Sequence, residues 1–228
     1  MILSPRTLQC LAALALTIAP ATAARGQKVG FVLGRSVSDV VTRFSGNVGE
    51  SYPDRHSIAA GVTYRHRLTP GVVLEPELLV VPRGWSSQSL PTLTMTYLEL
   101  PVLLRIGAMT DGGWPLRPVL SVGPAVSWRL TCALDGTGQA DSGSGCRTQG
   151  TYEPGDDYHI RRFDVSAQLG LALEARIAGA IVGLDGRYEY GLVDITPKAS
   201  GHTRNGAFLV LFHFVPKQGP RSTGAQPE

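Results

Sequence analysis

Lysine is nearly absent from this sequence of 228 residues, in which it occurs only as Lys28, Lys198 and Lys217. The 21 Lys+Arg residues are therefore almost all arginine, the formal net charge is only +3, and no clustered basic stretch occurs. Proteins that bind nucleic acid carry a basic patch or stripe on one face. We therefore expect no nucleic-acid partner.

Long hydrophobic runs are also missing beyond the N-terminal region. A membrane-spanning helix needs about 20 consecutive and mostly apolar residues, and no later segment approaches that length. If the mature chain lies in a membrane, it must cross the membrane as strands.

The N-terminal segment has the three parts of a secretory signal peptide. Arg6 precedes an apolar run over residues 8–18, and the small residues of "ATAA" follow it. This order is typical of a signal peptide that is removed on export. We predict a signal peptide over residues 1–24, cut near Ala23 or Ala24. The alternative is a short membrane anchor, for which the apolar run is too short.

Cysteine is scarce, and only one pair lies outside the predicted signal peptide. Cys132 and Cys146 bracket "ALDGTGQADSGSG", which belongs to the longest polar stretch of the chain. No His or further Cys lies at a metal-ligand spacing from the pair. Because disulfides form in exported proteins, we predict that these two residues form a loop disulfide.

The common catalytic motifs are absent as well, since the sequence has no G-x-S-x-G, H-E-x-x-H, Walker or dinucleotide fingerprint. One constellation in the predicted outer loops, His159 and His202 near Asp156 and Asp157, suggests acid–base or metal chemistry at a barrel rim. We interpret it as part of a solvated loop. We therefore predict a protein without enzymatic activity, cofactor or metal, and keep a rim-active outer-membrane enzyme as an alternative.

What the sequence does contain is alternation between apolar and small or polar residues, which is typical of strands with two unlike faces. It also contains 27 Gly and 16 Pro, which suit strands and turns. Long and short connections alternate between the predicted strands, as they do in outer-membrane barrels. The eight predicted strands are Lys28–Ser36, His56–Arg67, Val72–Gly84, Leu93–Ala108, Arg117–Leu130, Arg161–Ile177, Ala180–Leu192 and Gly206–Val215.

The two faces of these strands differ in side-chain size. In the segment Phe163–Ala175, for example, Leu169, Leu171 and Leu173 share one face, while Ser166 and Gly170 lie on the other. A solvated strand surface does not limit side-chain size and gives no reason for glycine, which weakens strands. The narrow lumen of an eight-stranded barrel does favour glycine and alanine, because they are small. We therefore expect the apolar face to contact lipid. Tyr97, Trp128, Tyr188 and other aromatic residues near strand ends are expected to form girdles at the membrane interfaces.

Charged residues share the small-residue face, and a buried charge is tolerable only when it is paired. Arginine suits such pairs because its guanidinium is a planar fork. We predict a lumen network that plugs the barrel, and the alternative is a solvated charged face. The predicted network consists of Glu75, Glu77, Glu99, Arg105, Arg129, Asp164, Glu174, Asp185, Arg187 and Glu189, with Arg65 as a further cation and His213 as an inward polar group.

Three stretches carry a resemblance to a known family: "YLELPVLLRIG" (Tyr97–Gly107), "GRYEYGLVDI" (Gly186–Ile195) and "GAFLVLFHF" (Gly206–Phe214). They resemble a recurrent strand, the penultimate strand and the closing aromatic strand of the PorT-like outer membrane protein β-barrel family, within the wider porin family. The resemblance implies a small barrel of the Gram-negative-type outer membrane. It also implies contact with barrel-assembly machinery, for which Phe214 could act as an internal signal.

These observations together predict an all-β protein, an eight-stranded antiparallel up-and-down transmembrane β-barrel. The barrel domain is expected over residues 25–216, followed by a flexible C-terminal tail over residues 217–228. We expect it in the outer membrane, in contact with lipid and an unknown surface ligand. Its expected role is binding, adhesion, envelope integrity or limited passage of small solutes. A secreted lipocalin-like carrier of an apolar ligand and a passive pore are further alternatives.

Overall fold

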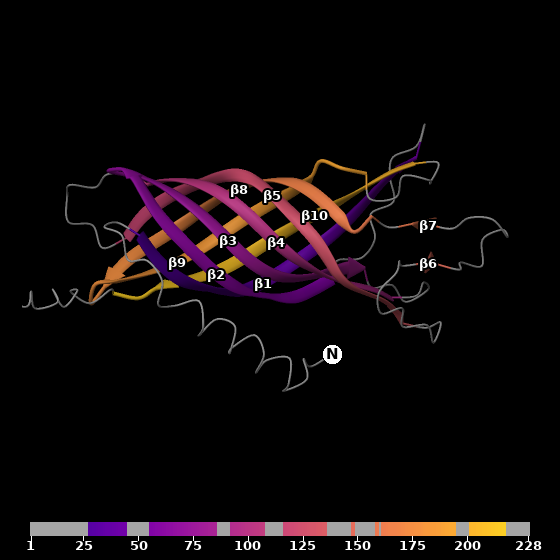
Figure 1. Cartoon of the computed structure of the whole chain (residues 1–228), viewed down its shortest axis with the longest axis horizontal. Helices are drawn as coiled ribbons and strands as arrows, with labels where there is room; N and C mark the ends of the chain where they lie inside the picture. The colour runs from indigo at the N-terminus through magenta and orange to yellow at the C-terminus, as the bar shows by residue number, and fades with distance from the viewer. Residues whose placement is uncertain are drawn as a thin grey trace, which may run out of the picture.

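Eight long strands close into a barrel in the computed structural model of this chain (Figure 1). The structure describes residues 27–44, 55–85, 92–107, 116–135, 147–148, 158–159, 161–194 and 201–217. No helix among these residues is long and apolar enough to span a membrane. The barrel strands are β1 (Gln27–Phe44), β2 (Arg55–Thr69), β3 (Val72–Trp85), β4 (Thr92–Gly107), β5 (Leu116–Asp135), β8 (Phe163–Ile177), β9 (Ala180–Gly191) and β10 (Gly201–Val215).

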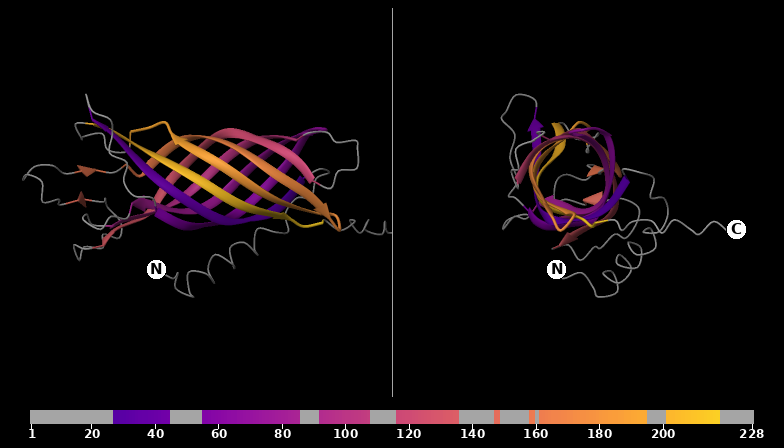
Figure 2. Two further views of the ribbon diagram at one scale, coloured as in Figure 1. Left: turned by 180° about the vertical axis from the view of Figure 1, so that it is seen from behind. Right: turned by 90° about the vertical axis from the view of Figure 1, so that its left-hand side faces the viewer.

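The strands form an antiparallel meander, because each barrel strand pairs with the next one along the chain. β1 also pairs with β10, with Phe31 opposite Phe214, and this pairing closes the ring. The ring therefore has no free edge, as the end-on view in Figure 2 shows. The all-β barrel predicted from the sequence is confirmed.

All eight predicted strands are present, but three of them extend at least five residues beyond the predicted bounds. β1 continues to Phe44, β5 continues to Asp135 and β10 already begins at Gly201. These extensions lie at the barrel end that carries the longer connections. Pairing between β1 and β10 runs as far as Phe44 opposite Gly201. Two-residue strands β6 (Arg147–Thr148) and β7 (Tyr158–His159) form a separate ribbon between β5 and β8, and the sequence did not predict it.

Two short turns lie at the opposite end. β2 and β3 are joined by Pro70 and Gly71, and Gly71 has φ 90°. Proline followed by a residue with positive φ is the pair that a type II turn favours. β8 and β9 are joined by Ala178 and Gly179, with φ 49° and 84°. Positive φ at both positions is typical of the type I′ hairpin turn.

The outer surface is the apolar face, as the alternation predicts. Leu169, Leu171 and Leu173 are 58%, 70% and 52% exposed, whereas Asp164 on the other face of β8 is 1% exposed. The same alternation continues around the ring. Among the further exposed apolar side chains are Phe31, Leu33, Ile58, Leu100, Ile106, Leu120, Trp128, Leu184, Tyr188, Phe208, Phe212 and Phe214.

The interior differs from the prediction in two respects. One part of it is apolar, because Leu79, Leu209 and Leu211 are buried in a cluster contributed by β1, β2, β3 and β10. Tyr97, predicted to belong to an interface girdle, is also fully buried. Tyr97 shares the strand phase of Glu99, and strand alternation therefore turns it inward. Trp128 is half exposed on the outer surface.

Candidate functional site

The interior of the barrel holds ion pairs that cross from one wall to the other. Arg187 on β9 donates two hydrogen bonds to Glu77 on β3, Nη1 to Oε2 at 2.7 Å and Nη2 to Oε1 at 2.9 Å. β3 and β9 are four positions apart in the ring of eight strands, so they lie on opposite walls. A bidentate pair of this kind is strong and fixed in geometry.

Arg83 makes a second crossing contact towards the long-loop end. Its guanidinium pairs with Glu99 on the neighbouring strand β4 and with Glu189 on β9, the latter at 2.6 Å. The guanidinium carbon also lies 5.2 Å from the centre of the Tyr97 ring, in cation–π range. Gln168 on β8 donates to Glu99 at 2.6 Å. Side chains from β3, β4, β8 and β9 thus meet at this level.

A third group lies towards the short-turn end. Arg65 on β2 bridges Glu75 at 2.8 Å and Glu174 at 2.5 Å, and β8, which carries Glu174, stands opposite β2 in the ring. Arg105 on β4 contacts the same two carboxylates at 3.2 and 3.1 Å and Asp185 at 2.6 Å. The three groups stack along the lumen, since Asp185 also accepts a hydrogen bond from Arg187 at 3.0 Å.

The structure brings most of the predicted lumen charges together. Glu75, Glu77, Glu99, Arg105, Asp185, Arg187 and Glu189 are each no more than 2% exposed and ion-paired. Glu174 is ion-paired at the edge of the same network. The other two predicted residues are buried but differ in their contacts. Asp164 accepts a hydrogen bond from Asn205 at 2.8 Å, and Arg129 forms no ion pair within the described residues.

The sequence did not lead us to Arg83, which is 1% exposed and pairs with two carboxylates in the lumen. The signal was present, because Arg83 has the same strand phase as Glu75 and Glu77, and that phase places it on the lumen face of β3. Two neutral partners, Gln168 and Asn205, were missed as well. Their amides can donate and accept hydrogen bonds, which suits them to a lumen of fixed charges.

His213 points inward, as predicted, and lies close to two carboxylates, those of Glu75 and Glu77. Its Nε2 lies 3.2 Å from Arg187 Nη2, and its Nδ1 lies 3.4 Å from Glu75 Oε1. Ligand-type atoms of Glu75, Glu77 and His213 lie within 4.8 Å of one another. Both carboxylates, however, already hold guanidinium groups, Glu75 those of two arginines and Glu77 that of Arg187. The group therefore acts chemically as part of the ion-pair network.

Several predicted features lie outside the described residues. The signal peptide over residues 1–24 is one, as are Asp157, the side chain of His159 and the tail beyond residue 217. Cys132 lies near the end of β5 and is 9% exposed, while Cys146 falls outside the described residues. The disulfide between them stays a prediction.

A known protein family matches most of this chain. The outer membrane protein beta-barrel domain family matches residues 21–196. No curated protein matches the chain. Among solved structures, the chain is similar to Ail, the attachment invasion locus protein of Yersinia pestis, with 14% identity, coverage of 84% of this chain and 99% of that one, and a TM-score of 0.44.

Two further solved structures are similar at the same level. Neisserial surface protein A (NspA) has 11% identity, coverage of 80% of this chain and 95% of that one, and a TM-score of 0.42. OprG from Pseudomonas aeruginosa has 13% identity, coverage of 85% and 99%, and a TM-score of 0.41. The family match extends over more than half of the chain and agrees with the closed barrel and its apolar outer surface. The chain therefore belongs to the outer membrane protein beta-barrel domain family and is an outer-membrane protein.

Proposed function

We propose that this protein is a non-enzymatic outer-membrane barrel that closes its own lumen and acts through the loops at one rim. The observation that carries the proposal is the set of side chains spanning the interior, above all Arg187 to Glu77 and Arg83 to Glu189. Both pairs join opposite walls, and all four side chains are no more than 1% exposed. A wide water-filled path needs an interior free of such contacts.

Barrel size supports the same proposal. Eight strands enclose an interior that side chains fill, whereas porins with 16–18 strands leave an aqueous channel. The inward-facing Leu79, Leu209 and Leu211 occupy further interior space. The favoured role is accordingly binding, adhesion or envelope integrity. Passage is at most limited to very small solutes.

The loops are candidates for the functional surface because the three longest connections between barrel strands, residues 45–54, 136–162 and 192–200, share one end of the barrel. In outer-membrane barrels, long loops face the outside of the cell and short turns face the periplasm. We accordingly propose that the end with the turns at Gly71 and Gly179 faces the periplasm. We propose that an unknown surface ligand binds at the other end. Limited proteolysis of intact cells tests this orientation, because trypsin should cut the long-loop side without permeabilisation.

We propose two partners, membrane lipid at the outer surface and the barrel-assembly machinery at the last strand. Half-exposed apolar side chains such as Phe208 and Phe212 suit contact with acyl chains. Phe214 on β10 is our candidate for the aromatic signal that barrel-assembly machinery reads. Within the family we propose a PorT-like member, from the three stretches quoted above.

The secreted-carrier alternative was wrong. A lipocalin-like carrier lines its cavity with the apolar set, but here Leu171 and its strand neighbours face outward, and the chain belongs to an outer-membrane family. The rim-active enzyme would need Asp157 and His159. Exchanging either of them for alanine tests that alternative by the loss of any lipid- or peptide-modifying activity.

Liposome swelling tests the closed lumen directly. Vesicles carrying the refolded protein are placed in isotonic glycine, arabinose or a disaccharide, with empty vesicles and vesicles carrying a 16-stranded porin as controls. We expect swelling no faster than in empty vesicles for arabinose and the disaccharide. Swelling at a rate comparable to that of the porin vesicles would refute the proposal.

A further inference from the structure

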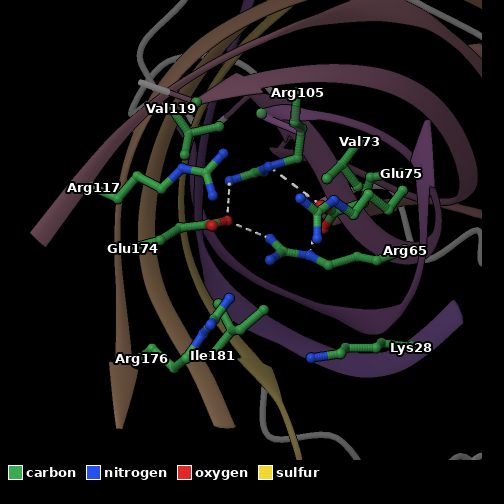
Figure 3. Close-up of a pocket in the computed structure, with 13 residues that line it drawn as sticks. Lys28, Arg65, Val73, Glu75, Arg105, Arg117, Val119, Glu174, Arg176 and Ile181 are labelled. Carbon is green, nitrogen blue, oxygen red and sulfur yellow. Dashed lines mark hydrogen bonds and ion pairs between the residues drawn. The ribbon is translucent and has the colours of Figure 1, made fainter. Parts of the chain in front are cut away.

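The short-turn end of the barrel, which the proposed orientation places in the periplasm, contains a cavity of about 220 Å³ (Figure 3). This volume is far larger than one water molecule requires. Side chains from the starts and ends of several strands line it, close to the turn at Gly71. Its basic lining residues are Lys28, Arg65, Arg67, Arg105, Arg117 and Arg176. We call this cavity the basic cup.

Positively charged residues outnumber negatively charged ones in the basic cup. Only two acidic residues, Glu75 and Glu174, line it together with the six basic ones, which leaves an excess of four positive charges (6 − 2). Both carboxylates are already engaged by Arg65 and Arg105 at 2.5–3.2 Å. Within the described part of the chain, the other four cations have no carboxylate partner.

The Arg117 side chain lies against the backbone of Gly107 in the cup. A Cβ added to Gly107 would lie 2.3 Å from Arg117 Nε and 2.4 Å from Nη2, so the guanidinium lies directly against the glycine backbone. Gly107 is itself fixed, because its N–H donates to the carbonyl of Gly71 at 2.9 Å. Arg117 Nε is buried and has no hydrogen-bond partner among the described residues. In Figure 3 the guanidinium points into the cup, beside that of Arg105.

We propose that the basic cup binds a multivalent phosphate-type oxyanion from the periplasmic side. Arginine recognises such anions because its planar fork donates two hydrogen bonds to a phosphate group at once. A bound dianion or larger anion offsets the repulsion among the unpaired cations. It also supplies acceptors for donors such as Arg117 Nε. The anion belongs either to a free phosphate compound or to an anionic lipid headgroup of the inner leaflet.

Calorimetric titration of inorganic pyrophosphate into the full protein, refolded in zwitterionic micelles, tests the site. We expect saturable binding at one site per chain. Arg117→Gln and Arg176→Gln should each weaken it by about tenfold, the scale of one charge-assisted hydrogen bond. Arg161→Gln removes the same charge from an exposed residue at the opposite end of the barrel and should leave the affinity within about twofold. Heat-modifiable migration on a gel verifies that each variant is folded.

Gly107→Ala tests whether binding depends on the position of the Arg117 guanidinium and not only on the net positive charge of the cup. The variant keeps every charge but displaces the Arg117 guanidinium, so it should weaken pyrophosphate binding, by less than Arg117→Gln because the end of this flexible side chain can shift. An affinity unchanged by Gly107→Ala would show general attraction by positive charge and no built site. Nanodiscs with and without phosphatidylglycerol then distinguish the two sources, because a lipid headgroup in the cup would compete with pyrophosphate. The proposal is overturned if pyrophosphate does not bind, or if Arg161→Gln weakens binding as much as Arg117→Gln. Because the site does not require a closed lumen, its failure would leave the proposed function intact.

Discussion

Arg187 and Glu77 join opposite walls of the barrel through two hydrogen bonds of 2.7 and 2.9 Å, at a level where neither side chain is more than 1% exposed. A contact of this kind fixes the spacing of β9 and β3 and also occupies the centre of the lumen. One pair of residues therefore links the stability of the barrel to its permeability.

Removing one partner of the crossing pair should destabilise the barrel strongly. Glu77→Gln leaves the Arg187 guanidinium without its bidentate carboxylate, and breaking a buried pair costs up to about 3–5 kcal/mol, the lower part of this range being expected here because Asp185 still pairs with Arg187. Urea unfolding of the protein folded in lipid vesicles measures the free energy of unfolding. The double variant Glu77→Leu/Arg187→Met should recover much of the loss, because apolar replacement of both partners is often neutral. A double variant with a lower free energy of unfolding than Glu77→Gln would contradict this interpretation.

The outer surface should show the depth dependence of a lipid-facing strand. Leu171 lies near the middle of β8, and Leu171→Arg should lower the free energy of unfolding in vesicles by about 2–4 kcal/mol. Ile177 faces outward at the end of the same strand, so Ile177→Arg should cost only about 0–1 kcal/mol. Equal costs at the two positions would show that Leu171 is not at the centre of the bilayer.

Close packing between strands should make some lumen glycines irreplaceable. A Cβ at Gly123 on β5 would lie 2.0 Å from the carbonyl oxygen of Val102 on β4, and only a backbone shift could relieve that clash. We expect Gly123→Ala to cost at least about 1–3 kcal/mol. Gly186→Ala on the outward face of β9 is the control for the glycine-to-alanine change itself, because its Cβ would meet only ordinary contacts of 3.7 and 3.9 Å. A small effect of Gly123→Ala on the urea midpoint would contradict the packing shown here.

The two cysteines of the mature chain should be oxidised after export. We predict that Cys132 and Cys146 form one intramolecular disulfide, because the protein folds in an oxidising compartment. Maleimide labelling of the denatured protein should find no free thiol before reduction and two after it. One reactive thiol in the unreduced protein would contradict the prediction.

The alternation along β8 and its neighbours was sufficient to predict the strands and which face of each points outward. It could not predict which charges meet, because partners such as Glu77 and Arg187 lie 110 residues apart and are joined only by closure of the ring. The same alternation places Arg83 on the lumen face of β3, although the prediction did not include it. Tyr97 was misplaced because an aromatic near a strand end fits a girdle by type, although its phase turns it inward. β6 and β7 have two residues each, too few for any periodic signal.

Single-channel recording in planar bilayers is the most direct test of the closed lumen. The wild-type protein should give no open-channel steps, because ion pairs between opposite walls fill the interior. Glu77→Ala/Arg187→Ala removes both ends of the central pair and should produce measurable steps, while Leu171→Ala on the lipid face should not. Open steps in the wild type as large as those of the double variant would contradict the account.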